Sequence, residues 1–309
     1  MYIGIDIGGT KCAVVTADDS GKKLSRVAFE TMDADTTLNR IFHEIEQLPP
    51  CRAIGISCGG PLDEQRGLIL SPPNLPGWDE IPVTHMLTER FQVPAYLCND
   101  ANACALAEWK FGAGRGSQNM IFLTFGTGMG AGLILNGRLY CGTNGNAGEV
   151  GHMRIHDFGP VGYGKSGSFE GFCSGGGIKQ LGQTLALEQL QRGQTTAYCH
   201  SHDELDSITA KSLALAADNG DKTAIRVWEI VSQKLGAGLS LLIDLLNPER
   251  IVIGSIFERA EHLLRDGLVK VIAQEALPQS ARVCRILPAE LGDEIGDYAA
   301  IAVAMKEGF

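Results

Sequence analysis

The stretch Tyr2-Ile-Gly-Ile-Asp-Ile-Gly-Gly-Thr-Lys-Cys-Ala-Val-Val-Thr-Ala17 carries the first prediction about the fold. Its two β-rich runs, joined by a pair of glycines, are typical of a β-hairpin. The same pattern of strand, Gly-Thr turn and strand recurs at 119–135, around Gly126-Thr127-Gly128. A repeat of one supersecondary unit predicts two similar α/β domains that face each other across a cleft.

Chain length also favours two domains, because 309 residues correspond to about two domains at roughly 150 residues each. We expect a small N-terminal domain made of residues 1–116 together with a C-terminal helix within 294–309. That helix, over 294–306, is expected to pack back on the first domain. Residues 117–293 are expected to form the large C-terminal domain.

Between the two repeats, short apolar runs alternate with helical periodicities, as in α/β proteins. We expect a third strand at 24–31 and a helix that begins near Thr36 or Thr37, its candidate caps, and runs to about Gln47. The glycine-rich residues 142–177 are expected to be mostly loop. The C-terminal third is expected to be helical, notably over 223–246, with one strand at 250–253.

Charge and composition exclude several classes of protein. Lys plus Arg is 26 and Asp plus Glu is 36, which gives a net charge of −10 and no basic face for nucleic acid. The most apolar run, Leu235–Leu246, contains Asp244 and is shorter than the roughly 18 residues that a membrane span requires. Without a basic, apolar leader, and with nine cysteines but no CxxC pair, the chain is expected to be cytoplasmic and its thiols reduced.

Asp6 and the turn after it suit phosphate and magnesium binding. Glycines let backbone N–H groups approach phosphate oxygens, Thr10 adds a hydroxyl donor and Lys11 adds a positive charge. An aspartate beside such a turn is suited to hold Mg²⁺, directly or through water. An ordinary hairpin explains one such turn equally well, but the second copy at Gly126-Thr127 favours a clamp on a polyphosphate.

Asn99-Asp100 lies where a strand is expected to end and a helix to begin. One interpretation is that Asp100 only caps the helix. The other is that Asp100 is a general base at the edge of the sheet where α/β folds bind their ligands. Phosphoryl transfer needs a carboxylate that orients the attacking hydroxyl and accepts its proton.

Glu149 and His152 lie three residues apart, and Glu170 follows in the same glycine-rich region. Two carboxylates and an imidazole can exchange hydrogen bonds with several sugar hydroxyls. A histidine with satisfied hydrogen bonds in the core is the alternative interpretation of His152.

Five motifs resemble, in their order and spacing, those of the ROK (repressor, ORF, kinase) family of sugar kinases and sugar-responsive repressors. They are Asp6-Ile-Gly-Gly-Thr-Lys11, Asn74-Leu-Pro-Gly-Trp78, Asn99-Asp-Ala-Asn-Ala103, Gly126-Thr-Gly128 and Ala147-Gly-Glu-Val-Gly-His152. The resemblance extends over essentially the whole chain. It implies two ribonuclease-H-like domains of the actin-like ATPase fold, and ATP-dependent phosphorylation of a hexose hydroxyl, usually at O6.

Carried over position by position, the resemblance implies that Asp100 is the catalytic base. It implies sugar binding by Asn74, Asn99, Glu149, His152 and Glu170. It implies that Mg²⁺ and phosphates are bound by Asp6, Gly9, Thr10, Lys11, Gly126 and Thr127, and that adenosine lies against Gly254. It also implies a homodimer.

One departure from the family pattern concerns zinc. Family members usually carry a CxCGxxGCxE stretch whose three cysteines bind a structural zinc together with the preceding histidine. Here the stretch is Val161-Gly-Tyr-Gly-Lys-Ser-Gly-Ser-Phe-Glu170, so Val161, Tyr163 and Ser168 take the cysteine positions. Since zinc needs about four ligands, we expect no zinc site. An apolar anchor from Phe158 or Phe169, with a hydrogen bond from Tyr163, is a candidate replacement.

Three functions stay open at this point. The first is an ATP-dependent kinase for the 6-hydroxyl of glucose or a close relative such as allose, N-acetylmannosamine, N-acetylglucosamine, fructose or a β-glucoside. ATP is favoured over polyphosphate as the donor. The second is a non-catalytic sugar-sensing regulator; DNA binding is not expected of it, because family repressors carry an N-terminal helix-turn-helix module whereas the first expected strand begins at residue 2. The third is an acetate-kinase-like or actin-like ATPase.

Overall fold

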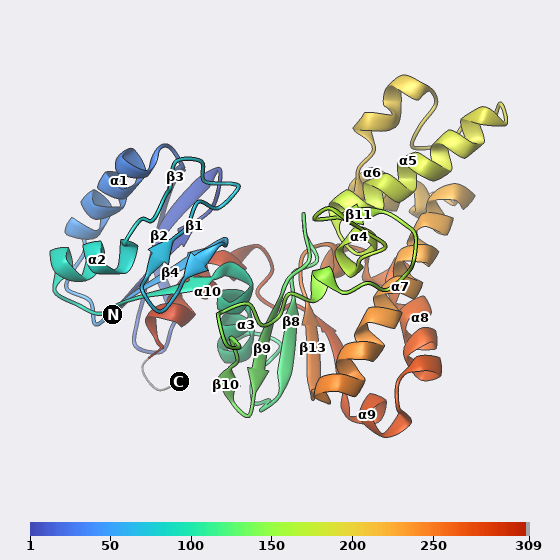
Figure 1. Cartoon of the computed structure of the whole chain (residues 1–309). Coiled ribbons are helices and arrows are strands. Elements are labelled where there is room, and N and C mark those ends of the chain that lie inside the picture. Colours follow the sequence, from blue (N-terminus) through green and yellow to red (C-terminus); the bar gives the residue numbers. More distant parts are fainter. Residues whose placement is uncertain (307–309) are drawn as a thin grey trace. The chain divides into compact units, whose positions relative to one another are not determined.

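A computed structural model describes residues 1–306 of the chain, which form two compact units (Figure 1). The first unit contains residues 1–118, 132–147 and 290 onward. The second contains residues 119–131 and 148–289.

The first unit is built on a five-stranded sheet with the order β3-β2-β1-β4-β7. Its strands are β1 (Tyr2–Ile7), β2 (Lys11–Ala17), β3 (Lys23–Glu30), β4 (Ile54–Cys58) and β7 (Ala95–Asn99). β1, β2 and β3 pair antiparallel, and β1, β4 and β7 pair parallel. The predicted hairpin at the N-terminus is therefore confirmed, with Ile7 opposite Cys12 at its turn.

Four α-helices belong to the first unit: α1 (Ala34–Glu46), α2 (Val83–Phe91), α3 (Asp100–Phe111) and α10 (Ile295–Ala304). The predicted start of α1 is wrong, because Asp33 caps this helix by accepting a hydrogen bond from Thr36 N at 2.9 Å. The hydroxyl of Thr37 instead accepts a hydrogen bond from Met32 N. The short pair β5 (Leu62–Asp63) and β6 (Leu68–Ile69) also lies in this unit.

Helix α10 packs directly on the first sheet, as the sequence predicts. A Cβ built on Gly4 of β1 would lie 2.8 Å from Ile301 N, and one on Gly55 of β4 would lie 2.1 Å from Ala304 N. Only glycine at these two positions lets the helix backbone come this close to the strands. Through these close contacts, α10 near the end of the chain packs against β1 at its beginning.

The second sheet repeats the order of the first: β10-β9-β8-β13-β14. Its strands are β8 (Met120–Leu123), β9 (Ala131–Leu135), β10 (Arg138–Leu139), β13 (Arg250–Ile253) and β14 (Arg285–Pro288). β14, parallel to β13, is an additional strand in the C-terminal third, where the sequence predicts only one. It has four residues and ends in proline, so it has too little alternation to be recognised.

Helices make up most of the second unit. They are α4 (Phe169–Phe172), α5 (Gly175–Gln191), α6 (Ala210–Asp218), α7 (Lys222–Leu246), α8 (Ile256–Glu275) and α9 (Pro278–Val283). The second unit also has two short 3-10 helices, η1 (Val150–His152) and η2 (His202–Ser207), and a third, η3 (Gly292–Glu294), lies in the first unit. The prediction for 223–246 is confirmed by α7.

Residues 142–177 contain more regular structure than the predicted loop. η1, α4 and the hairpin β11 (Val161–Gly162) and β12 (Lys165–Ser166) lie within this range. α5 also begins inside it, because Ser174 caps the helix and three glycines form its first turn.

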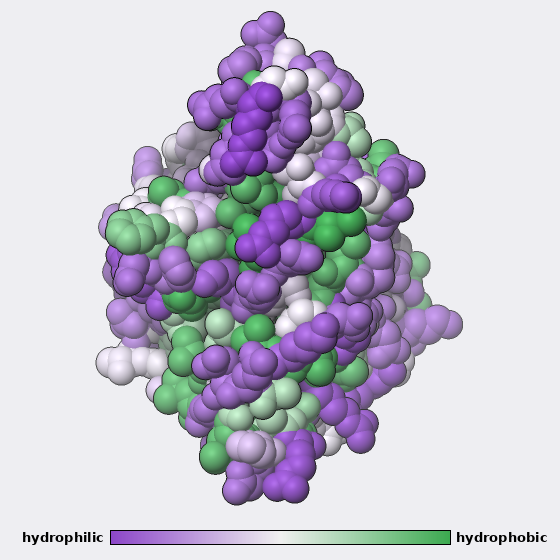
Figure 2. Space-filling view, turned by 90° about the vertical axis from the view of Figure 1, so that its right-hand side faces the viewer, coloured by the Kyte–Doolittle hydropathy of each residue, from purple (hydrophilic) through white to green (hydrophobic). Residues whose placement is uncertain are grey.

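The face drawn in Figure 2 is mostly polar, with groups of hydrophobic residues between the polar ones. Within residues 1–306, no helix is long and apolar enough to cross a membrane. All nine cysteines carry free thiols, and five of them are buried.

Candidate functional site

In the first unit, the turn after β1 presents exposed backbone. Gly8 N donates to Lys11 O at 3.0 Å, and Thr31 N donates to Thr10 O at 3.1 Å, which fixes both ends of the turn. Gly9, Thr10 and Lys11 are exposed at its tip. The turn is thus held by backbone hydrogen bonds, while its tip faces solvent.

The loop that carries Asn74 lies against this turn. A Cβ on Gly9 would be 2.7 Å from both the Cβ and the carbonyl oxygen of Asn74. Leu75 and Trp78 anchor the loop in the hydrophobic core, whereas Asn74 itself is exposed. The structure therefore brings together a residue predicted to bind phosphate and one predicted to bind sugar.

Asn99 and Asp100 occupy the start of α3, but Asn99 is the capping residue. Its Oδ1 accepts a hydrogen bond from Ala101 N at 3.0 Å, and Asp100 Oδ1 accepts one from the same N–H at 2.8 Å. Asp100 is exposed, and a Cβ on Gly59 would lie 3.8 Å from its Oδ2. Asn99 and Asp100 thus share one N–H of the first turn of α3, with Asn99 as the capping residue.

Glu64 is a member of this group that sequence analysis misses. Its Oε1 accepts a hydrogen bond from Asn99 N at 2.8 Å, from a position 35 residues earlier in the chain. An acidic residue in the short loop after β5 gives no sequence signal of this contact.

Asp6 is the next-to-last residue of β1 and feels the charges of other carboxylates. Burial, together with the negative charges of Asp297 and Asp100, raises the pKa of Asp6 to about 6, although the charge of Arg26 opposes the rise. Its Oδ2 lies 2.7 Å from the position of a Cβ on Gly296, so α10 closes over the carboxylate. A carboxylate in such a negative field favours either a proton or a cation.

In the second unit, the turn after β8 is closed by several short contacts. Thr124 N donates to Gly130 O at 3.0 Å, and Gly130 N donates to Thr124 Oγ1 at 2.8 Å. Gly126 N donates to Gly128 O at 3.1 Å. Thr127, at the tip, is exposed.

Gly254 lies close to the same turn. It is buried, and a Cβ there would be 3.3 Å from the ring of Phe122. The next residue, Ser255, has a φ of 58°, and its N–H donates a hydrogen bond to Glu258 Oε1 at 2.6 Å. A Cβ on Gly126 would lie 3.6 Å from Ser255 Oγ. Two residues predicted to bind nucleotide are thus neighbours.

Helix α5 begins beside this turn, which the sequence does not reveal. Gly175 N donates to Gly126 O at 2.8 Å, and Ser174 Oγ accepts from Gly177 N at 3.0 Å. The capping serine before three glycines is the signal that could have identified this helix start.

The predicted sugar-binding residues of the second unit lie on η1 and α4. Glu149 and His152 are exposed, and Glu170 is partly buried. The rings of His152 and Tyr163 meet edge to face with centroids 5.4 Å apart. Lys165 Nζ donates to His152 O at 2.6 Å. The β11–β12 hairpin therefore holds the segment that carries His152.

The hairpin and the cap of α4 together occupy the three positions where the family pattern has cysteines. Ser168 caps α4 by accepting from Gly171 N at 3.0 Å. Phe169 is fully buried and packs on Gly238, whereas Phe158 is 79% exposed, so Phe158 is not the anchor that the sequence suggests as a candidate. Among residues 1–306, no group of three or more His, Cys, Asp or Glu side chains is placed to hold a metal ion.

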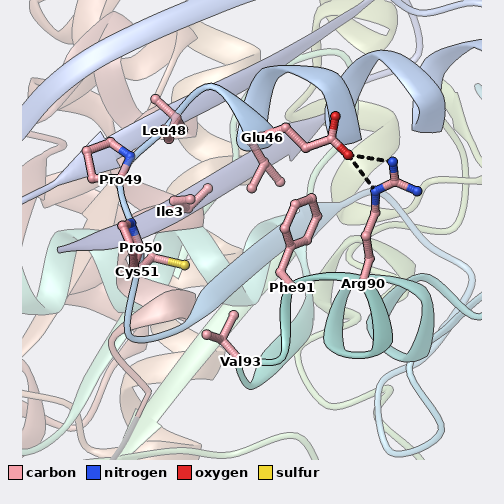
Figure 3. Close-up of a pocket in the computed structure, with 10 residues that line it drawn as sticks. Ile3, Glu46, Leu48, Pro49, Pro50, Cys51, Arg90, Phe91 and Val93 are labelled. Atoms are coloured by element: carbon pink, nitrogen blue, oxygen red, sulfur yellow. Dashed lines mark hydrogen bonds and ion pairs between the residues drawn. The ribbon is translucent and has the colours of Figure 1, made fainter.

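A pocket of about 320 Å³ in the first unit contains none of the predicted site residues (Figure 3). Its walls are largely apolar, with Ile3, Leu48 and Phe91 among them. Its two charged side chains neutralise each other, because Arg90 Nη2 lies 2.5 Å from Glu46 Oε1. This pocket offers no unpaired charge to a phosphate.

The structure therefore gathers the predicted residues into two groups, one in each unit. Asp6, Gly9, Thr10, Lys11, Asn74, Asn99 and Asp100 belong to the first. Gly126, Thr127, Glu149, His152, Glu170 and Gly254 belong to the second.

Known proteins with similar sequences include both enzymes and regulators. A glucokinase of Halalkalibacterium halodurans is 30% identical over 96% of this chain and 92% of its own length. The DNA-binding transcriptional dual regulator NagC of Escherichia coli is 30% identical over 99% of this chain and 76% of its own length. Sequence similarity therefore supports a hexose kinase, but the same identity to a regulator means that similarity does not distinguish the two functions.

A solved structure gives the same fold. The ROK family glucokinase of Streptomyces griseus, in complex with glucose and AMPPNP, superposes with a TM-score of 0.77 at 30% identity, covering 99% of both chains. The ROK family model matches residues 2–307. On this match, which covers nearly the whole sequence, the chain belongs to the ROK family.

Proposed function

We propose that this protein is a hexose kinase that transfers the γ-phosphoryl group of ATP to the 6-hydroxyl of glucose or a close relative. The observation that carries the proposal is the grouping in the first unit. Asp100, at the start of α3, shares an electrostatic environment with Asp6, and Asn74 lies against the Gly9 turn. A base, a cation ligand, a phosphate-binding turn and a sugar-binding residue are the parts that phosphoryl transfer needs.

In this proposal, Asp100 accepts the proton of the attacking hydroxyl. The hydroxyl oxygen forms a bond to the γ-phosphorus while the bond from that phosphorus to the β,γ-bridging oxygen breaks, and ADP leaves. Asn99 sits beside Asp100, with its Oδ1 engaged by the helix N-terminus, so its amide is oriented for a sugar hydroxyl. Asn74 adds a second exposed amide. Each side chain is thus assigned a contact suited to its donors and acceptors.

Asp6 fits a magnesium ligand. Its carboxylate lies in a field made negative by Asp297 and Asp100, which a divalent cation would relieve. When bound, the ion would neutralise charge on the phosphate oxygens. The exposed backbone of the two Gly-Thr turns would contact the phosphates, and Gly254 would lie against adenosine.

In the second unit, Glu149, His152 and Glu170 are assigned to the sugar. Two of these side chains are exposed and the third is partly buried. The three provide both acceptors and donors for neighbouring hydroxyls. The proposal also includes a homodimer. It includes no nucleic-acid partner, in keeping with a net charge of −10.

A sugar-sensing regulator is the second candidate, and the similarity to NagC favours it. It requires the sugar-binding residues but neither Asp100 nor the phosphate turns. An exposed aspartate at the start of α3, in the same electrostatic environment as Asp6, supports the kinase instead.

A coupled ADP-release assay with Mg-ATP against a panel of hexoses and amino sugars tests the proposal. We expect turnover on one sugar, and a loss of about 10²–10⁴-fold in kcat for Asp100→Asn, as for the removal of a general base. Undiminished turnover in Asp100→Asn would contradict the assigned base. Sugar binding by calorimetry without turnover on any sugar would support the regulator.

A further inference from the structure

The side chain of Glu170 lies where four segments of the second unit meet. A Cβ on Gly128 would be 2.8 Å from Glu170 Oε2. Cβ atoms on Gly151 and Gly162 would be 3.2 Å and 2.9 Å from Glu170 Cβ. These glycines belong to the turn after β8, to η1 and to β11, so the side chain of Glu170, which is itself on α4, runs through a slot lined by glycine.

One oxygen of this carboxylate already has a partner in the turn after β8. Met129 N donates to Glu170 Oε2 at 3.0 Å, within hydrogen-bonding range. Met129 is buried, and Glu170 is partly buried. A hydrogen bond to a partly desolvated carboxylate is stronger than one between neutral groups, so Glu170 helps to fix the shape of the turn.

We propose that Glu170 couples the sugar site to the phosphate turn. Oε2 holds the turn through Met129 N–H, while Oε1 accepts a hydrogen bond from a sugar hydroxyl. This inference rests on the proposed function, which assigns sugar to Glu170 and phosphate to Gly126-Thr127. A sugar that orders the carboxylate then also orders the turn, so each ligand raises the affinity for the other.

Glu149 provides the contrast within the same unit. It carries the same carboxylate and the same proposed sugar contact, but it is exposed at the start of η1. Within residues 1–306, no glycine other than its chain neighbour Gly148 has Glu149 among the atoms nearest to a built Cβ. Glu149→Gln is therefore the matched control for Glu170→Gln.

The test measures binding of Mg-AMPPNP by calorimetry, with and without the sugar that the panel assay identifies, or with glucose if none turns over. For Glu170→Gln we expect nucleotide affinity without sugar to fall about tenfold, because the neutral amide oxygen accepts a weaker hydrogen bond from Met129 N than the carboxylate does. We also expect the effect of sugar on nucleotide affinity to disappear. Glu149→Gln should weaken sugar binding and leave nucleotide affinity without sugar unchanged.

A second variant distinguishes the loss of this hydrogen bond from a general loss of folding. Gly128→Ala keeps Glu170 but places a methyl group 2.8 Å from Oε2, which pushes the carboxylate away from Met129. We expect it to reproduce the loss of nucleotide affinity at an unchanged melting temperature.

The outcomes separate this inference from the proposed function. Wild-type nucleotide affinity and intact coupling in Glu170→Gln would overturn the inference, leaving Glu170 as a sugar ligand alone. Failure of the wild-type protein to bind nucleotide would overturn both proposals. Binding of both ligands without turnover would overturn the kinase alone, because the coupling is measured by binding.

Discussion

The two Gly-Thr turns have the same sequence pattern but are held in place differently. The first is fixed by backbone hydrogen bonds and abuts the main chain of Asn74. The second is also closed by backbone hydrogen bonds, but it has two further hydrogen bonds, one to the side chain of Glu170 and one from the start of α5. The repeated motif thus gives both turns the same sequence pattern, whereas the residues that pack against each turn differ between the units.

This difference predicts unequal responses to an added methyl group. In Gly9→Ala the new Cβ would lie 2.7 Å from main-chain atoms that cannot easily move, so the turn and the Asn74 loop must both shift. We expect kcat/KM for ATP to fall about 10²-fold, the scale of a displacement of about 1 Å at a reacting centre. In Gly128→Ala the new Cβ would contact only the end of the flexible Glu170 side chain. We therefore expect kcat/KM for ATP to fall only about tenfold. Steady-state kinetics measures both, and equal losses would remove the distinction between the turns.

The next prediction concerns charge, which is concentrated beside the first turn. Asp6→Asn removes a buried negative charge from a field of like charges, so the unliganded protein should gain stability. We expect the free energy of unfolding at pH 7 to rise by about 1–3 kcal/mol in denaturant titrations, while activity falls. A loss of stability would show that the favourable contacts of the carboxylate outweigh its burial.

The same carboxylate gives a pH dependence of definite sign. Its pKa is about 6 in the folded protein and near 3.8 in the unfolded chain, so the folded state binds more protons between these values. The contribution of Asp6 therefore makes the wild-type protein less stable as pH rises from about 4 to about 6, and this penalty is fully present above pH 6. Asp6→Asn should lack that contribution, which thermal unfolding at stepped pH would measure. Since a cation binds the ionised form, the affinity of the unliganded protein for Mg²⁺ should fall as pH drops below about 6.

The smallest effect is expected in the hairpin behind the second turn. Tyr163→Leu removes the edge-to-face contact with His152, worth about 0.5–1.5 kcal/mol, so KM for sugar should rise about threefold with kcat unchanged. Phe158→Leu is the matched control, because that ring is as exposed as Tyr163 (79% against 80%) but is not part of the edge-to-face pair with His152. A zinc-selective chelator in excess Mg²⁺ should leave wild-type turnover intact. Loss of activity on chelation would mean that the hairpin alone does not hold His152.

Much of the fold follows from the sequence because its patterns are local. The glycine turns after Ile7 and Phe125 and the apolar stripe of α7 need no knowledge of distant residues. Strand β14 and the start of α5 escape prediction for opposite reasons. The strand is too short to show a period, and Gly175-Gly176-Gly177 is poor helix-forming sequence that is stabilised by the Ser174 cap and by packing.

The candidate site is predictable as a set of residues but not as a set of contacts. The sequence predicts that Glu170 binds a sugar. The hydrogen bond that Glu170 Oε2 accepts from Met129 N joins positions 41 residues apart. Likewise, the contact from Glu64 to Asn99 spans 35 residues. Such pairs depend on how elements pack, which one sequence does not encode in any local pattern.

Helix α10 has a consequence for how the chain is made. Since Gly4 and Gly55 receive the backbone of this helix, the first sheet lacks part of its cover until Ile295–Ala304 has left the ribosome. The whole second unit is synthesised in the meantime. We therefore expect the nascent N-terminal sheet to be protease-sensitive in chains stalled at residue 289 and protected in the full chain. The first unit to be translated would then be the last to mature, with its apolar face open to chaperones throughout synthesis.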